Sequence, residues 1–101
     1  MEGIAIGLSS NSIEILKRLK KTEFVKEIYI ASSTYEKKIE ENQIPLIKPK
    51  EVIKEKWKNL DLIIFIGSIG ASIRLINSFL NKIYEYFYPN FIKISLYLFY
   101  I

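Results

Sequence analysis

Three short apolar segments constrain the fold of this chain more than any other feature. They cover residues 4–8 (IAIGL), 27–31 (EIYIA) and 61–66 (DLIIFI), and the first and last are apolar at almost every position. Strands with that composition are buried on both faces, as in parallel sheets covered by helices on both sides. The segment 61–66 is the most apolar of the three, so we expect it in the centre of the sheet.

Segments with helical spacing follow the first and last strands. After residue 8, Asn11 and Glu14 match the pattern of a capping box, and the apolar residues that follow recur at helical intervals. The recurring residues are Ile13, Leu16 and Leu19. From Ile69, a second helix carries an apolar stripe that steps by four, three, four and three residues. That stripe consists of Ile73, Ile76, Leu80 and Ile83.

The middle of the chain is less regular. Within residues 32–47, Glu36 to Glu41 could form one helical turn, and Ile44 to Ile47 could pair briefly at an edge of the sheet. Pro49 suits the first turn of a further helix, where its missing N–H is not needed. Trp57 lies on the apolar side of that helix with Val52, Ile53 and Lys56, and is interpreted as a packing anchor.

The alternation of strands and helices predicts an α/β fold. We expect a small three-layer structure, in which a parallel sheet has helices packed on it and right-handed crossovers join the strands. The first strand should lie beside the strand at 61–66. The expected domain spans residues 1–83.

Residues 84–101 form an aromatic tail of uncertain structure. Five tyrosines and three phenylalanines fall there without a clean period, and Pro89 lies in the middle. A membrane-spanning helix needs about 20 predominantly apolar residues, and Glu85, Pro89, Asn90 and Lys93 interrupt this segment. No transmembrane span is expected. The composition of the tail is irregular. Three alternatives stay open for it: a fourth strand, a segment that docks on a membrane surface or a partner, and a sequence not selected to fold.

Composition excludes several kinds of chemistry. The 101 residues include no cysteine and no histidine, so zinc, haem and iron–sulfur ligation, cysteine nucleophiles and a Ser-His-Asp relay within this chain are not expected. The net charge of +4 comes from scattered lysines, without the basic and aromatic pattern that tracks nucleic acid. The segment Met1 to Gly3 does not resemble a secretion signal, which predicts a cytoplasmic location.

Two turns could hold a ligand, because both should join a strand to the N-terminus of a helix at the same edge of the sheet. They are "GLSSNS" at 7–12 and "GSIGAS" at 67–72. Free N–H groups and the helix dipole favour an anion there. The candidate binding residues are Ser9, Ser10, Gly67, Ser68, Gly70, Ser72 and Arg74. The alternative is that the glycines relieve tight turns, the serines cap helices and Arg74 forms an ion pair.

The segment "IIFIGSIGASIRLI" resembles the N-terminal domain of cobalt-precorrin-5A hydrolase, a hydrolase of anaerobic cobalamin (vitamin B12) biosynthesis. The family pattern is an apolar strand, then G-[AS]-x-G, small or apolar residues and R-L-I, which here ends at Arg74-Leu75-Ile76. The opening "IAIGLSSNSIEILKRLKK" and the lead-in "KNLDLIIFIGS" are also similar. The resemblance covers about residues 3–80.

This resemblance implies a cobalt-corrinoid substrate and no separate cofactor or bound metal. Members of the family open the ring A lactone of the substrate and release acetaldehyde. The acetate and propionate arms of a corrinoid suit the candidate residues, but no catalytic residue is identified. A second hypothesis is a small α/β module that binds an anion or metabolite without catalysis. A third is a peripheral protein whose aromatic tail docks on a membrane or another subunit.

The chain departs from the family after about residue 80. The lysine-aspartate-proline turn, the next strand and the serine-glycine-histidine segment of the family do not follow Asn81. We therefore expect a truncated or frameshifted relative that is inactive alone, and that forms a homo-oligomer or pairs with a chain supplying the missing domains. Whether this protein is an enzyme stays open on the sequence.

Overall fold

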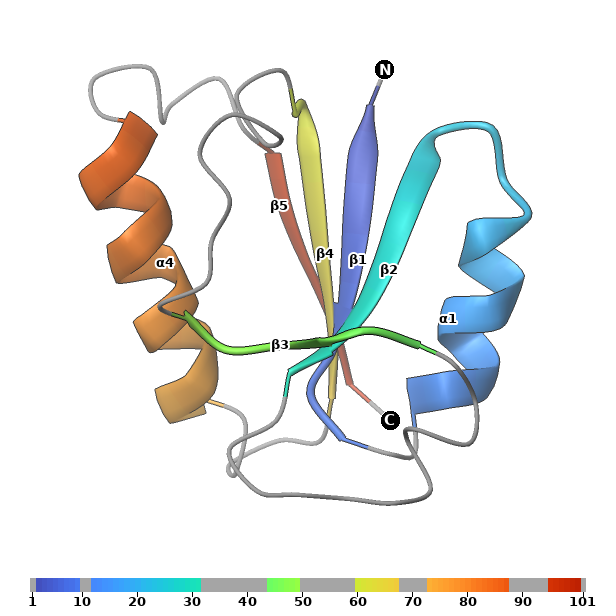
Figure 1. Ribbon diagram of the computed structural model, residues 1–101, viewed down its shortest axis with the longest axis horizontal. Helices are drawn as coiled ribbons and strands as arrows, with labels where there is room; N and C mark the ends of the chain where they lie inside the picture. Colours follow the sequence, from blue (N-terminus) through green and yellow to red (C-terminus); the bar gives the residue numbers. More distant parts are fainter. Residues whose placement is uncertain are drawn as a thin grey trace.

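The computed structural model describes residues 2–9, 12–31, 44–49, 60–67, 73–87 and 95–100, with the backbone alone for 86, 87 and 95–100. The described elements are β1 (Gly3–Gly7), α1 (Ile13–Lys20), β2 (Val25–Ala31), β3 (Leu46–Ile47), β4 (Leu62–Gly67), α4 (Ile73–Phe87) and β5 (Ser95–Tyr100). All strand pairs are parallel, and the strands lie in the order β3-β2-β1-β4-β5 (Figure 1).

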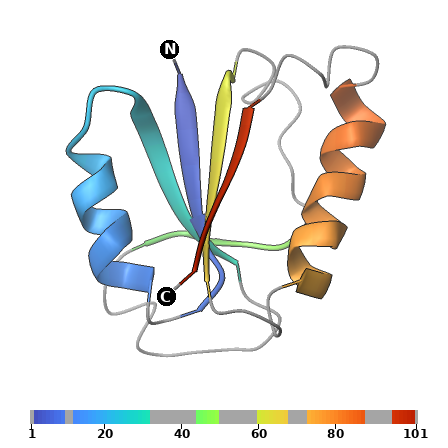
Figure 2. The same cartoon turned by 180° about the vertical axis from the view of Figure 1, so that it is seen from behind.

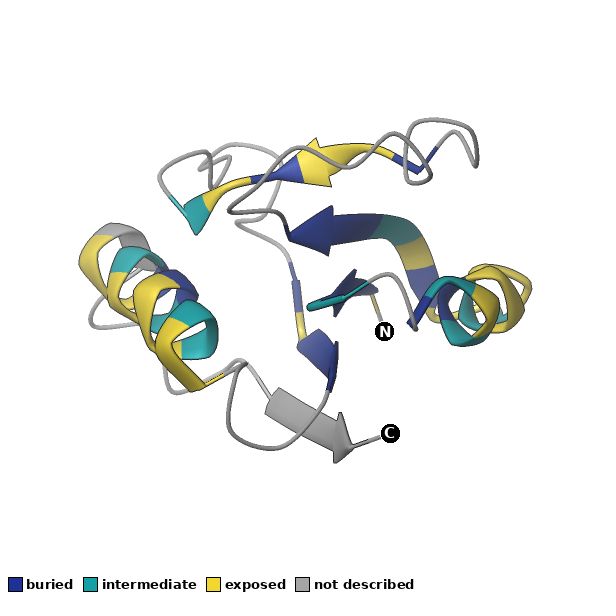
Figure 3. Cartoon of the chain, turned by 90° about the horizontal axis from the view of Figure 1, so that it is seen from below, coloured by how far each residue is buried: buried dark blue, intermediate teal, exposed yellow. Residues whose placement is uncertain are grey.

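The expected α/β fold is confirmed. Helices α1 and α4 lie on opposite sides of the sheet, which gives three layers when the molecule is viewed along its strands (Figure 3). The strand at 61–66 corresponds to β4, and it pairs with β1 as expected, from Gly3 beside Leu62 to Gly7 beside Ile66. The expected edge pairing within 44–47 is also present, as β3 beside β2.

Alternating side chains of the central strands build a core on each face of the sheet. Successive residues of a strand point to opposite faces, so a fully apolar strand supplies both cores. On the α4 side, the core contains Ile4, Ile6, Tyr29, Ala31, Ile63, Phe65, Phe79 and Ile83. On the α1 side, it contains Ala5, Leu16, Val25, Ile30, Leu62, Ile64 and Ile66. Every residue of β1 and of β4 is buried.

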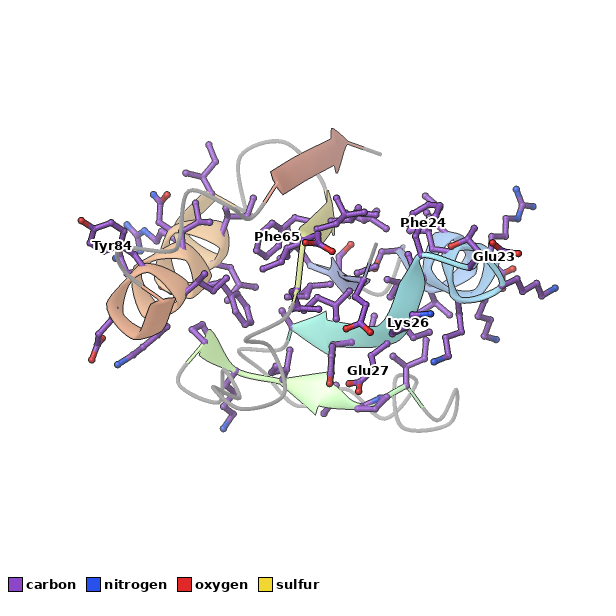
Figure 4. All side chains as sticks on the ribbon, turned by 90° about the horizontal axis from the view of Figure 1, so that it is seen from above. Glu23, Phe24, Lys26, Glu27, Phe65 and Tyr84 are labelled. Atoms are coloured by element: carbon purple, nitrogen blue, oxygen red, sulfur yellow. The ribbon has the colours of Figure 1, made fainter. Side chains whose placement is uncertain are left out.

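The apolar stripe of α4 differs from the expected one. Ile73 is 51% exposed, whereas Phe79 and Ile83 are fully buried. The ring of Phe79 lies 6.0 Å from that of Phe65, which extends from β4 toward α4 (Figure 4). With 3.6 residues per turn, Ile73 lies roughly 100° around the helix from the midpoint of Phe79 and Ile83. The expected stripe was therefore wrong at Ile73 and omitted Phe79.

Residues 95–100 of the aromatic tail form strand β5 in the sheet, which was one of the open alternatives. Helix α4 also continues past residue 83, as far as Phe87. Among the described residues, no helix is long and apolar enough to cross a membrane. The expected helical turn at 36–41 and the expected helix with Trp57 lie outside the described residues.

Gly7 allows α1 to begin close against the end of β1. A Cβ atom at Gly7 would overlap the Ser12 hydroxyl and would lie 2.8 Å from Cδ1 of Leu16. Ser12 and Leu16 are both completely buried, so neither has free space to move into. The glycine inside the first apolar run is therefore required for packing.

We predict that Gly7→Ala destabilises the protein by about 1–3 kcal/mol, the usual cost of overpacking a core. Chemical denaturation measures this change. In a Ser12→Gly background, where part of the overlap is removed, the same substitution should cost less. An equal cost in both backgrounds would contradict the proposed contact.

We also predict that Phe79→Ala costs about 3–5 kcal/mol, as expected for a large buried aromatic side chain. Ile73→Ala is the matched control on the same helix, and it should change the free energy of unfolding by less than about 0.5 kcal/mol because the residue is exposed. Equal effects of the two substitutions in denaturant unfolding would mean that α4 is rotated relative to this description.

Candidate functional site

The carboxyl ends of β1 and β4 lie side by side and form the candidate site. Gly7 is paired with Ile66, and the N–H of Leu8 donates a 2.7 Å hydrogen bond to the carbonyl of Ile66. We name this edge the β1/β4 rim, made of Gly7, Leu8, Ser9, Ile66 and Gly67. Two of the candidate binding residues, Ser9 and Gly67, are thus brought together at one edge of the sheet.

The helices that follow β1 and β4 lie on opposite faces of the sheet. The chain after β1 leads to α1 on one face of the sheet, and the chain after β4 leads to α4 on the other face (Figures 1 and 2). Strands beside which the connections diverge in this way form a topological switch point, where open α/β sheets bind their ligands. Both helices begin at this edge of the sheet, so their N-terminal ends lie on the same side as the rim.

The start of α1 differs from the expected capping box. The residue before the helix is Ser12, and its side chain does not cap the helix. Instead, the Ser12 hydroxyl donates a 2.6 Å hydrogen bond to the carbonyl of Ser9, and the Ser12 N–H donates to the same carbonyl at 3.1 Å. The expected cap, Asn11, lies outside the described residues. The N–H groups of the first turn are therefore without a cap from the side chain of Ser12.

The Ser9 hydroxyl is buried without a hydrogen-bond partner in the described part of the chain. The Ser9 carbonyl, by contrast, accepts hydrogen bonds from Ser12. An unsatisfied buried polar group costs about 1–3 kcal/mol. Such a group at a switch point is a reason to look for a ligand or water that accepts or donates a hydrogen bond there.

Charged residues are unevenly distributed around the rim. Glu14 is exposed in the first turn of α1, where its negative charge works against an anion. The basic residues of α1 belong to its last turn, at the other end of the helix. They are Lys17, Arg18 and Lys20. A cation for the rim must therefore come from elsewhere, and among the described residues that start at this edge it is Arg74.

Arg74 is the second residue of α4 and is exposed. It lies roughly 160° around the helix from the midpoint of Phe79 and Ile83, so it starts on the side turned away from the sheet. Its carbonyl accepts a 3.0 Å hydrogen bond from the Ser78 hydroxyl, but its guanidinium has no ion pair within the described chain. Arg74 is thus at the end of α4 that lies on the side of the rim, and no described contact holds it against Ser9.

The remaining candidate binding residues cannot be placed. Ser10, Ser68, Gly70 and Ser72 lie outside the described residues. The sequence analysis did not single out Gly7 and Ser12 as site residues, although both shape the rim. The sequence signal that could have identified them is a glycine at the end of a buried strand, followed five residues later by a serine at the start of a helix.

No group of three or more histidine, cysteine, aspartate or glutamate side chains that could hold a metal occurs within the described ranges. The rim offers hydroxyl and amide donors instead, which suit an oxyanion or a carboxylate. Comparison of the chain with models of protein families, with curated proteins and with solved structures gave no match.

Proposed function

We propose that this chain binds the carboxylate arms of a cobalt-corrinoid at the β1/β4 rim. The observation that carries the proposal is the Ser9 hydroxyl, buried without a described partner where the connections from β1 and β4 diverge. A carboxylate oxygen accepts a hydrogen bond from a hydroxyl and from the free N–H groups of a helix N-terminus. The resemblance to cobalt-precorrin-5A hydrolase supplies the identity of the ligand.

The reaction proposed by that resemblance is opening of the ring A lactone with release of acetaldehyde. The described residues of the rim provide binding groups, with no pair of acidic side chains positioned for acid and base catalysis. Glu14 lies in the first turn of α1, at the helix end beside the rim, and it is exposed. For this chain we propose a binding role in a cytoplasmic cobalamin pathway, as a relative of the hydrolase that is inactive alone.

A small anion-binding module is the second candidate. The first turn of α1 lacks a side-chain cap from Ser12, so its N–H groups and the Ser9 hydroxyl are donors of the kind that a small oxyanion accepts. This function needs no corrinoid and no catalyst. Such a function would account for the unsatisfied donors at the rim, and it would not require a charge from Arg74.

A spectroscopic titration separates the two candidates. The full chain is mixed with a cobalt-corrinoid that carries free acetate and propionate arms, and the visible absorbance of the corrinoid is followed. A saturable shift supports the first candidate. Inorganic phosphate is tested in parallel by calorimetry, and binding of phosphate without any corrinoid shift would favour the anion-binding module.

We predict that Ser9→Ala weakens corrinoid binding by about tenfold to a hundredfold, the effect of losing a hydrogen bond to a charged group. Without ligand, the variant should be as stable as the original chain or more stable by up to about 1 kcal/mol, because an unsatisfied hydroxyl is removed. Ser78→Ala, which removes an exposed hydroxyl of α4, is the control and should change neither quantity. A large loss of stability in Ser9→Ala would show that the hydroxyl has a structural partner.

We predict that Arg74→Ala weakens corrinoid binding about two- to fivefold, the size of an exposed ion pair, and that added salt reduces the difference. Arg18→Ala removes the other arginine of the chain, at the far end of α1, and is the matched control. Both variants should keep their stability within about 0.5 kcal/mol, because both side chains are exposed. An equal loss of affinity in both variants would contradict a specific contact with Arg74, because it would show that only the net charge of the protein matters.

A further inference from the structure

The two edges of the sheet differ in how they are protected. The β3 edge has two residues, and it is preceded by Pro45 and followed by Lys48 and Pro49. Short strands, prolines and lysines are the usual devices that prevent an edge from pairing with another sheet.

Strand β5 itself has none of these devices, although Lys93 lies two residues before it in the sequence. Ser95–Tyr100 pairs with β4 along all six residues, and it is the last strand in the sheet order. Its sequence, SLYLFY, contains no charged residue and no proline. In a strand, alternate N–H and C=O groups point to each side, so the side of β5 away from β4 presents a row of backbone donors and acceptors.

We propose that β5 pairs with β5 of a second copy of this chain, joining the two sheets into one. Two copies related by a two-fold axis perpendicular to the sheet place their edge strands antiparallel, which is the more stable form of pairing. The axis then passes beside Tyr97 or Leu98, at the middle of the strand.

The chemistry of the edges favours a closed dimer. Residues opposite one another across the axis carry no charge, so like charges do not face each other despite the net charge of +4 on each chain. Growth into a longer assembly would require β5 of one copy to pair with β3 of the next, and the short β3 edge with its prolines opposes that contact. A dimer uses both β5 edges and leaves two protected β3 edges outside.

Sedimentation equilibrium of the full chain tests the proposal. The 11.9 kDa chain should behave as a species of twice that mass at high protein concentration and dissociate on dilution. Tyr97→Lys places two positive charges at or next to the axis and should yield a monomer at the same concentrations. Tyr84→Lys is the matched control, since it makes the same chemical change on the outer side of α4 (Figure 4), and it should remain a dimer.

Circular dichroism of each variant separates loss of pairing from loss of folding. If Tyr97→Lys unfolds, hydrogen exchange of the original chain gives the answer, because half of the amides of residues 95–100 should become protected as protein concentration rises. A chain that stays monomeric at high concentration, amides whose protection is independent of concentration, or a Tyr84→Lys variant that dissociates equally would overturn the proposal. Larger assemblies would overturn the closed dimer.

Discussion

The parallel pairing of β1 with β4 is the interaction on which the rest of the structure depends. It is held at both ends. At the amino end, the N–H of Asp61 donates to the carbonyl of Glu2 at 2.8 Å, and the N–H of Glu2 donates to the Asp61 carboxylate at 3.1 Å. At the carboxyl end, the N–H of Leu8 continues the ladder to Ile66. Because these two strands are distant in the sequence, their pairing brings the two turns to one edge.

The fold was predictable because local patterns and burial agree in the central strands. Apolar runs in β1 and β4 indicate burial on both faces, and both faces are indeed covered. The helix α4 was predictable as a helix, and Ile76, Leu80 and Ile83 of the expected stripe do pack on the core. Phe79 was missed because apolar residues occur on more than one side of the helix. Ile73 continues the helical spacing of the stripe, yet the side chain that packs on Phe65 is Phe79. Spacing alone does not say which of two neighbouring stripes faces the sheet.

The candidate site was predictable in position but not in detail. Two turns rich in glycine and serine follow buried strands, and the carboxyl ends of parallel strands lie at the same edge of a sheet. The sequence therefore indicates that the two turns lie at one edge. The cap at Asn11 followed from sequence spacing, which could not show that the Ser12 hydroxyl is directed back to the Ser9 carbonyl. That hydrogen bond depends on how closely α1 approaches Gly7, and the approach is a property of packing. The unsatisfied hydroxyl of Ser9 is likewise visible only when its surroundings are known.

The β1/β4 rim and the β5 edge are different surfaces that are linked through β4, where Ile66 and Gly67 of the rim pair with Phe99 and Tyr100. The rim lies at the carboxyl ends of β1 and β4, whereas the β5 edge runs along the side of the sheet, one strand beyond β4. In the proposed dimer, antiparallel pairing of β5 places the two rims at opposite ends of the joined sheet, because all strands within each copy are parallel. Neither rim is then covered by the partner copy, and a ligand at one rim does not contact the other. Dimer formation and ligand binding should therefore influence each other only through β4, which pairs with β5 and ends at the rim.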